Sequence, residues 1–216
     1  MTDTWSRVDG YLESMLGGHD DVLDSALAKC RACHLPPISV TPMMGKFLQI
    51  LALSIGAARI LEIGTLGGYS TIWLARALPA TGSIVSLEVD PAHASVAREN
   101  IAYAGLTDRV DLRVGDAIVT LPTLEGQFDM AFIDADKPSN PIYLRHAGRL
   151  VQTGGLVVVD NVIRNGAVAD SATDDPNALG VRAMNELLSS KPELQAAAIQ
   201  TVGSKGYDGF TLIRIP

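Results

Sequence analysis

The segment most informative about the fold reads Arg59-Ile60-Leu61-Glu62-Ile63-Gly64-Thr65-Leu66-Gly67-Gly68-Tyr69-Ser70. It begins as a short apolar run typical of a buried β-strand, and the glycines that follow predict a tight turn into a helix. Glycine lets a ligand approach the main chain, and N–H groups at a helix N-terminus attract anionic or polar atoms. We therefore expect unpaired backbone N–H groups at this turn to face a ligand.

A carboxylate is expected close to the glycine turn. Glu88 ends the next apolar run, about 20 residues after the glycines, which is the spacing at which an acid in a strand-helix-strand unit binds a ribose. The dinucleotide fingerprint Gly-x-Gly-x-x-Gly is not matched, because Leu66 stands where its second glycine belongs. A nicotinamide-dependent oxidoreductase remains an alternative, weakened by this mismatch.

Length and composition favour a single α/β domain. The chain has 216 residues, of which 47% are hydrophobic and 19% charged, so a large core can form. We assign all of residues 1–216 to one domain, with N-terminal helices in 1–57 and a Rossmann-like core in 58–216. The net charge is −7 without a basic cluster, which argues against nucleic acid as a partner. The absence of a long apolar run argues against a membrane partner, and the acidic N-terminus favours a cytoplasmic protein.

Strand and helix patterns alternate from Arg59 onward, which predicts a doubly wound, mostly parallel sheet of seven strands. The expected strands are 60–63, 84–88, 110–114, 129–133, 156–159, 197–202 and 210–215. The expected helices between them are 69–78, 91–104, 117–121, 141–150 and 176–189. Because the link 203–209 is short for a crossover, the last two strands should form an antiparallel hairpin.

Three helices are expected to cap the sheet at the N-terminal side. The first spans 4–16. The second begins at Asp20 or Asp21 and runs to about His34, and the third begins at Thr41-Pro42 and ends near Gly56. The second helix contains Cys30-Arg31-Ala32-Cys33-His34, which matches a haem-attachment pattern. We interpret this match as chance, because cysteine packs well as a small apolar residue on a helix.

Oxygen-bearing side chains follow two strands of the expected sheet. The fourth strand ends at Asp134, and the fifth at Asp160 and Asn161. Because parallel strands open their carboxyl ends on one edge, these side chains should converge beside Gly64. Two carboxylates and one amide oxygen suit Mg²⁺, with Ca²⁺ or Mn²⁺ as alternatives.

Taken together, four motifs resemble those of the cation-dependent class I S-adenosylmethionine O-methyltransferases, the family of the catechol and caffeoyl-coenzyme A O-methyltransferases. They are Glu62-Ile63-Gly64, Gly68-Tyr69-Ser70, Asp134-Ala135-Asp136-Lys137 and Asp160-Asn161, and the resemblance extends from about Ile38 to the end of the chain. It implies transfer of a methyl group from S-adenosylmethionine to a hydroxyl of a catechol-like aromatic small molecule.

The resemblance also implies a role for each matching residue. Asp134, Asp160 and Asn161 would hold the divalent metal, which chelates the acceptor, and Lys137 would be the catalytic base. The implied cofactor-binding residues are Val40, Glu62, Gly64, Thr65, Ser70, Glu88, Ala117 and Asp136, with Glu88 on the ribose and Ala117 by the adenine. Asn165 would contact the substrate. Family members commonly form homodimers, so a homodimer is expected.

Several points stay open at this level. A non-catalytic module that binds S-adenosylmethionine would carry the same fold. The acceptor, the methylated hydroxyl, the physiological metal and the pathway are not identified. Pro138 is expected to hold Lys137 in an extended conformation. The segment 161–180 contains no aromatic residue, so the acceptor wall that it forms should be polar and aliphatic.

Overall fold

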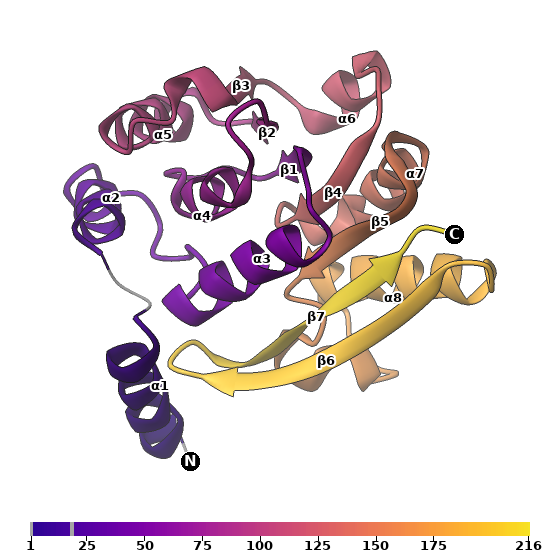
Figure 1. The fold of residues 1–216 in the computed structure, drawn as a ribbon. Helices are drawn as coiled ribbons and strands as arrows, with labels where there is room; N and C mark the ends of the chain where they lie inside the picture. The colour runs from indigo at the N-terminus through magenta and orange to yellow at the C-terminus, as the bar shows by residue number, and fades with distance from the viewer. Residues whose placement is uncertain (1, 18–19) are drawn as a thin grey trace.

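The computed structural model describes residues 2–17 and 20–216, and within them seven strands form one sheet in the order β3-β2-β1-β4-β5-β7-β6 (Figure 1). The strands are β1 (Arg59–Ile63), β2 (Ser83–Glu88), β3 (Val110–Val114), β4 (Phe128–Ile133), β5 (Val151–Asp160), β6 (Gln195–Gly203) and β7 (Gly206–Arg214). The first five run parallel, and β7 pairs antiparallel with both β5 and β6. The predicted fold class is confirmed.

Eight α-helices and four short 3₁₀ helices accompany the sheet in the described residues. The α-helices are α1 (Thr2–Leu16), α2 (Asp21–Ala32), α3 (Pro42–Ser54), α4 (Tyr69–Ala77), α5 (Pro91–Tyr103), α6 (Ala117–Thr120), α7 (Asn140–Leu150) and α8 (Pro176–Ser189). The 3₁₀ helices are η1 (Thr107–Arg109), η2 (Leu121–Thr123), η3 (Lys137–Ser139) and η4 (Arg164–Ala169). No helix in the described part of the chain is both long and apolar enough to span a bilayer.

Side-chain caps explain where the helices before the sheet begin. Asp20 caps α2, because its carboxylate accepts a hydrogen bond from Leu23 N at 2.8 Å. Thr41 caps α3 in the same way, with Pro42 in the first turn. In α2, Cys30 is buried while Cys33 is exposed, and both thiols are free. The packing role expected for Cys30 is confirmed.

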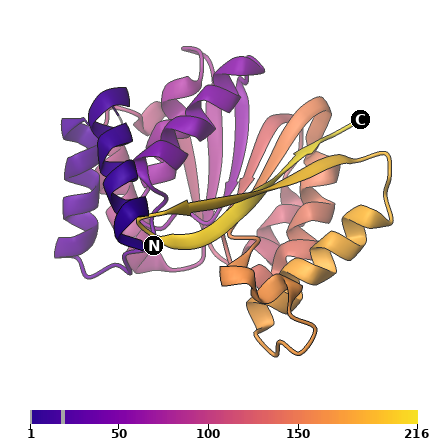
Figure 2. The ribbon, with the colours of Figure 1, turned by 90° about the horizontal axis from the view of Figure 1, so that it is seen from below.

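The sheet separates two apolar layers, because successive strand residues point to opposite faces. Ile60 and Ile84 pack with the helices α2 to α5, whereas Leu61 and Val85 pack with α6 to α8. Figure 2 shows these two helical layers on either side of the strands. Each fully buried aliphatic side chain stabilises the fold by about 1.5–3 kcal/mol, so both layers contribute strongly to holding the strand ends in place.

Two local predictions were wrong. The hairpin connection is the two-residue turn Ser204-Lys205, much shorter than the expected link 203–209, because β6 and β7 continue pairing to Gly203 and Gly206. Lys137 begins the 3₁₀ helix η3 instead of being extended. Asp136 caps η3 through Ser139 N, and this cap outweighs the restriction that Pro138 places on Lys137.

The first helix lies against the end of the hairpin, although it is far from it in sequence (Figure 2). Asp9 of α1 accepts a hydrogen bond from Ser204 N at 2.6 Å. A carboxylate bonded to a backbone N–H at a turn holds that turn in one position. Helix α1 therefore fixes the tip of β6 and β7.

Candidate active site

The carboxyl ends of the parallel strands open into a cavity of about 880 Å³. Its wall is formed by the glycine turn after β1 and by the ends of β2, β3 and β4. It includes most of the predicted site residues, namely Val40, Gly64, Thr65, Ser70, Glu88, Ala117, Asp134, Asp136, Lys137 and Asn161. Ligands of open α/β sheets bind at this edge, so the topology alone brings these distant residues together.

The glycine turn brings the end of β1 close to the end of β4. Gly64 has a φ of 96°, and a Cβ placed on it would lie 2.1 Å from the backbone oxygen of Asp134. Gly68 has a φ of 83° and is the N-cap residue directly before α4. Any larger residue at Gly64 would push Asp134 away, so this glycine is required for the close approach of the two strand ends.

Glu88 occupies the turn in a way that the sequence analysis did not foresee. Its Oε2 accepts hydrogen bonds from Thr65 N at 3.1 Å and Leu66 N at 2.7 Å, and its Oε1 accepts one from Asp90 N at 2.9 Å. The expectation of unpaired N–H groups was therefore wrong at Thr65 and Leu66. A carboxylate of the chain itself takes the place that a ligand phosphate has in a dinucleotide site, and its oxygens are held at the cavity wall.

Glu62 lies behind the cavity wall and is fully buried. Its carboxylate accepts hydrogen bonds from the hydroxyls of Ser70 at 2.6 Å, Thr71 at 2.5 Å and Ser86 at 2.6 Å. Burial raises the pKa of Glu62 to about 7, against the lowering effect of these hydroxyls. Glu62 therefore ties β1, β2 and the start of α4 together, and only Ser70 of this group reaches the cavity.

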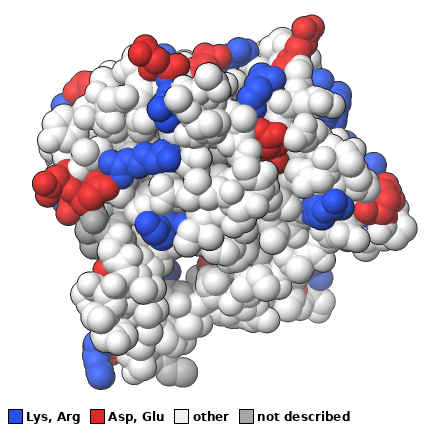
Figure 3. Space-filling model, viewed as in Figure 1, with Lys and Arg blue, Asp and Glu red and all other residues white. Residues whose placement is uncertain are grey.

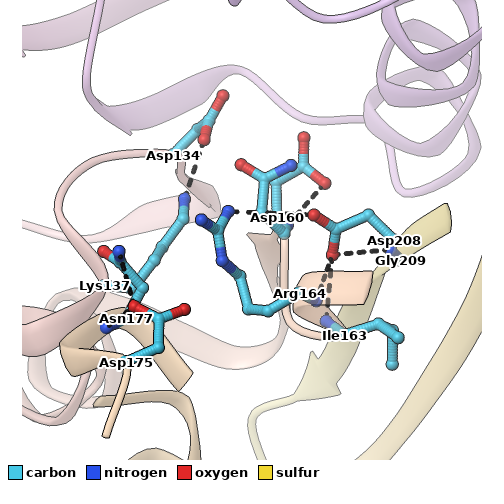
Figure 4. A network of polar contacts seen from close by, with 10 residues as sticks. Asp134, Lys137, Asp160, Ile163, Arg164, Asp175, Asn177, Asp208 and Gly209 are labelled. Atoms are coloured by element: carbon cyan, nitrogen blue, oxygen red, sulfur yellow. Dashed lines mark hydrogen bonds and ion pairs between the residues drawn. The ribbon is translucent and has the colours of Figure 1, made fainter. Parts of the chain in front are cut away.

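The residues after β4 and β5 form a compact polar group (Figure 4). Lys137 Nζ lies 2.9 Å from Asp134 Oδ1, and the lysine side chain is only 6% exposed. Burial, and next the nearby carboxylate of Asp134, raise the pKa of Asp160 to about 7. Two carboxylates that destabilise each other's charge favour a bound cation between them.

The segment after Asp160 turns sharply, and Asp208 of β7 holds it in place through hydrogen bonds. Asn161 and Arg164 adopt left-handed backbone conformations, with φ values of 56° and 54°. Asp208 Oδ1 accepts hydrogen bonds from Ile163 N at 2.9 Å and Arg164 N at 3.0 Å. Its other oxygen lies 3.9 Å from Arg164 Nη1 (Figure 4). Asp208 thus fixes the turn that presents Asn161 to the cavity.

A second cavity, of about 320 Å³, adjoins the first at Ile38, Val40 and Asn161. Asp160 lines this cavity and not the larger one. The remaining wall combines apolar side chains of α3 and β7 with the hairpin turn and α1. It includes Asp9, Met43, Met44, Phe47, Lys205 and Phe210. Phe47 and Phe210 pack together with ring centroids 5.0 Å apart.

The structure gathers most but not all of the predicted residues on these walls. Glu62 and Asn165 line neither cavity. Asn165 Oδ1 would lie 3.8 Å from a Cβ built on Gly206, so Asn165 is close to the hairpin turn. Tyr143, Arg164 and Lys205 line the cavities but were not predicted from the sequence. Tyr143 hydrogen-bonds to Asp136 in the larger cavity, and the pairing of Asp136 with a tyrosine seven residues later was its only sequence signal.

The set of possible metal donors is small. Among the described residues, no cluster of three or more His, Cys, Asp or Glu side chains could hold a metal ion. The candidate set therefore consists of Asp134, Asp160 and the amide of Asn161. A hard cation that keeps several waters needs only one or two protein carboxylates, so this donor set fits Mg²⁺.

The sequence matches the family model described as O-methyltransferase over residues 19–215. It is 52% identical to a catechol O-methyltransferase of Mycobacterium tuberculosis over 206 residues, which cover 95% of this chain and 93% of that protein. It is 49% identical to a catechol O-methyltransferase of Niastella koreensis over 212 residues, covering 96% of each.

Solved structures of other O-methyltransferases are also similar to this chain. An O-methyltransferase from Bacillus cereus, in complex with SAH, superposes with a TM-score of 0.98 at 46% identity and full coverage of both chains. The O-methyltransferase TomG from Streptomyces achromogenes, in complex with SAM, has a TM-score of 0.96 at 44% identity, covering 99% of this chain and 98% of that one. The match of the family model over most of the chain, together with these relatives, places the chain in the O-methyltransferase family, a family of enzymes.

Proposed function

We propose that this enzyme transfers a methyl group from S-adenosylmethionine to one hydroxyl of a catechol-like small molecule, assisted by Mg²⁺. The observation that carries the proposal is that Asp134, Lys137 and Asn161 open on the same cavity as the glycine turn and Glu88. Similar chains named catechol O-methyltransferase, and a similar structure in complex with SAM, support it.

The larger cavity would hold S-adenosylmethionine. Glu88 is held by three backbone N–H groups, which leaves lone pairs on its oxygens to accept hydrogen bonds from the ribose hydroxyls. Ala117 would lie by the adenine, while Val40, Gly64, Thr65 and Ser70 would surround the methionine part. Asp136, which follows β4, would also contact the cofactor. Glu62 would act indirectly, through its hydrogen bond to Ser70.

Asp134, Asp160 and Asn161 would hold the divalent cation. When bound, the cation would neutralise the crowded carboxylates and lower the pKa of the acceptor hydroxyl. Lys137 Nζ, fixed against Asp134, would take the proton from that hydroxyl. The oxygen then bonds to the sulfonium methyl carbon, the carbon–sulfur bond breaks, and S-adenosylhomocysteine leaves. Holding both reactants in adjoining cavities supplies much of the acceleration.

We also propose a homodimer formed around β6. Every residue of this edge strand except Gly203 is exposed, including the apolar side chains of Ile199 and Val202. The surface over α3 and the hairpin carries few charged side chains (Figure 3). An exposed edge strand invites pairing with another chain. Ile199→Glu should shift the molecular mass measured by light scattering from dimer to monomer, and a monomeric wild type would refute this part.

The enzymatic proposal is tested with catechol, S-adenosylmethionine and Mg²⁺, detecting the methylated catechol and S-adenosylhomocysteine by mass spectrometry. Both products should appear in equal amounts. Excess EDTA should abolish turnover while calorimetry still detects binding of S-adenosylhomocysteine. Full turnover in EDTA would remove the metal from the proposal. Cofactor binding without methylation of any catechol would favour the non-catalytic alternative.

A further inference from the structure

Three cationic side chains surround the two cavities, and they differ in how they are paired. Lys137 is paired with Asp134 at 2.9 Å, and Arg164 lies 3.9 Å from Asp208. Lys205, in the turn between β6 and β7, lines the second cavity. Among the residues that the structure describes, none forms a hydrogen bond or ion pair with its ammonium group. Lys205 thus has unused donors.

The carboxylates on the wall of the second cavity are, in contrast, already engaged. Asp9 accepts a hydrogen bond from Ser204 N, and Asp208 accepts from the backbone of the Asn161 turn and from Gly209 N. Asp160 accepts one from Asn161 N at 2.8 Å and is assigned above to the metal. Lys205 is therefore the charged side chain of this wall without a partner among the described residues, and its ammonium group can bind an anionic group of a ligand.

The position of Lys205 is fixed by a short turn that is hydrogen-bonded to α1. Its turn has only two residues, and Asp9 of α1 holds the neighbouring Ser204 N. Much of the Lys205 side chain is exposed to solvent. Partial burial nevertheless lowers the pKa of its ammonium group, while the negative charges of Asp134 and Asp160 act to raise that pKa. Lys205 lines the second cavity together with Asp160, close enough for this carboxylate to act on its charge.

Part of the wall of the second cavity is apolar. Asn161 is shared with the larger cavity and Asp160 precedes it in the chain, while Met43, Met44, Phe47 and Phe210 contribute side chains that suit an aromatic ring. A volume of about 320 Å³ can hold a ring together with a side chain. An acceptor with its hydroxyls at Asp160 and Asn161 would extend along this wall toward Lys205.

We infer that Lys205 is a specificity-determining residue, and that the preferred acceptors are catechols whose ring carries a side chain ending in a carboxylate. The ammonium of Lys205 would bind that carboxylate at the rim of the second cavity. The inference rests on the proposed methyl transfer to catechols and adds the chemical class of the acceptor's side chain.

The test compares 3-(3,4-dihydroxyphenyl)propanoic acid with its methyl ester and with an amine of similar length. The three acceptors share the catechol ring and differ in the charge of the side chain. For the wild type, kcat/KM should be about tenfold higher for the acid than for the ester, mostly through KM, because a charge-assisted hydrogen bond at a partly exposed site has about that effect. The amine should be the poorest of the three.

Variants at Lys205 then assign this preference to one side chain. Lys205→Gln should reduce the ratio of acid to ester to about one, Lys205→Arg should retain most of it, and Lys205→Glu should favour the amine. Lys191→Gln is the matched control, since Lys191 precedes β6 whereas Lys205 follows it. A preference for the acid that survives in Lys205→Gln would overturn the inference.

The outcomes separate this inference from the function on which it rests. Equal kcat/KM for acid and ester in the wild type would refute the role of Lys205 and leave catechol methylation standing. Failure to methylate all three acceptors and catechol itself would refute both. The comparison of the three acceptors uses only the wild type, so it tests the inference even if a Lys205 variant folds poorly.

Discussion

The two cavities of this enzyme are built in different ways from the same chain. The larger one is formed mainly by consecutive strand-helix units, so that Glu88 ends a strand while the glycine turn and Asp134 each follow directly after one. The smaller one joins α1, α3 and the C-terminal hairpin, which are far apart in sequence. With the cofactor and the acceptor placed as proposed above, cofactor binding would be encoded by local motifs, whereas selection of the acceptor would depend on long-range packing.

The largest expected effect is on the chemistry where the two cavities meet. Lys137→Ala removes the proposed base and should lower kcat by about 10²- to 10⁴-fold, the usual contribution of general base catalysis. Calorimetry should find little change in affinity for S-adenosylhomocysteine, because Glu88 and the glycine turn are intact. Lys191→Ala is the control. If Lys137→Ala kept a kcat close to that of the wild type, another residue would have to be the base.

A backbone substitution tests the rigidity of the larger cavity. Gly64→Ala would place a Cβ 2.1 Å from Asp134 O, at a φ of 96° that alanine rarely adopts. We expect the free energy of unfolding in urea to fall by about 3 kcal/mol. Gly148→Ala, in α7 with no atom within 4 Å of its Cβ, should instead stabilise by about 0.5–1 kcal/mol. Equal stability of the two variants would show that β1 and β4 can move apart.

A smaller effect is expected when Glu88 becomes an amide. The two oxygens of Glu88 accept from the backbone N–H groups of Thr65, Leu66 and Asp90, and Glu88→Gln replaces one of these oxygens by a donor. The affinity for S-adenosylhomocysteine should fall about tenfold, as for the loss of one charge-assisted hydrogen bond. Glu125→Gln, at an exposed position, is the control for calorimetry. Unchanged affinity would mean that Glu88 only braces the turn.

The most gradual effect concerns pH and the buried carboxyl behind the larger cavity. The pKa of Glu62 is raised from 4.5 to about 7 in the folded chain, so between these values the folded state binds more protons than the unfolded state. Stability should therefore fall as pH rises through this window, by at most about 1.4 kcal/mol per pH unit from this group.

Glu62→Gln removes this titration, so its free energy of unfolding should depend less on pH than that of the wild type. Urea unfolding is measured in EDTA without cofactor, so that ligand binding does not contribute, and Glu193→Gln is the exposed control. The pKa of Asp160 is also raised, so Asp160 contributes to the pH dependence of the free energy of unfolding in both proteins. Parallel pH profiles of wild type and Glu62→Gln would contradict the assignment.

The sequence by itself determined the order of strands and helices and the strand-end residues that line the larger cavity. These features depend on local patterns: apolar runs, glycines, and caps such as Asp20 and Thr41. Local patterns gave a wrong prediction where a residue distant in the sequence forms the contact. The N–H groups of the glycine turn were expected to be unpaired, but they donate hydrogen bonds to Glu88.

Only the tertiary structure decided how the second cavity is made. No pattern near Lys205 indicates that it lines a cavity with Met43, Phe47 and Asp160, because this depends on how α1, α3 and the hairpin pack together. The aromatic wall likewise comes from Phe47 and Phe210, outside the segment that the sequence analysis considered. Side chains meet across such distances because apolar burial draws helices and strands together regardless of their separation in the chain.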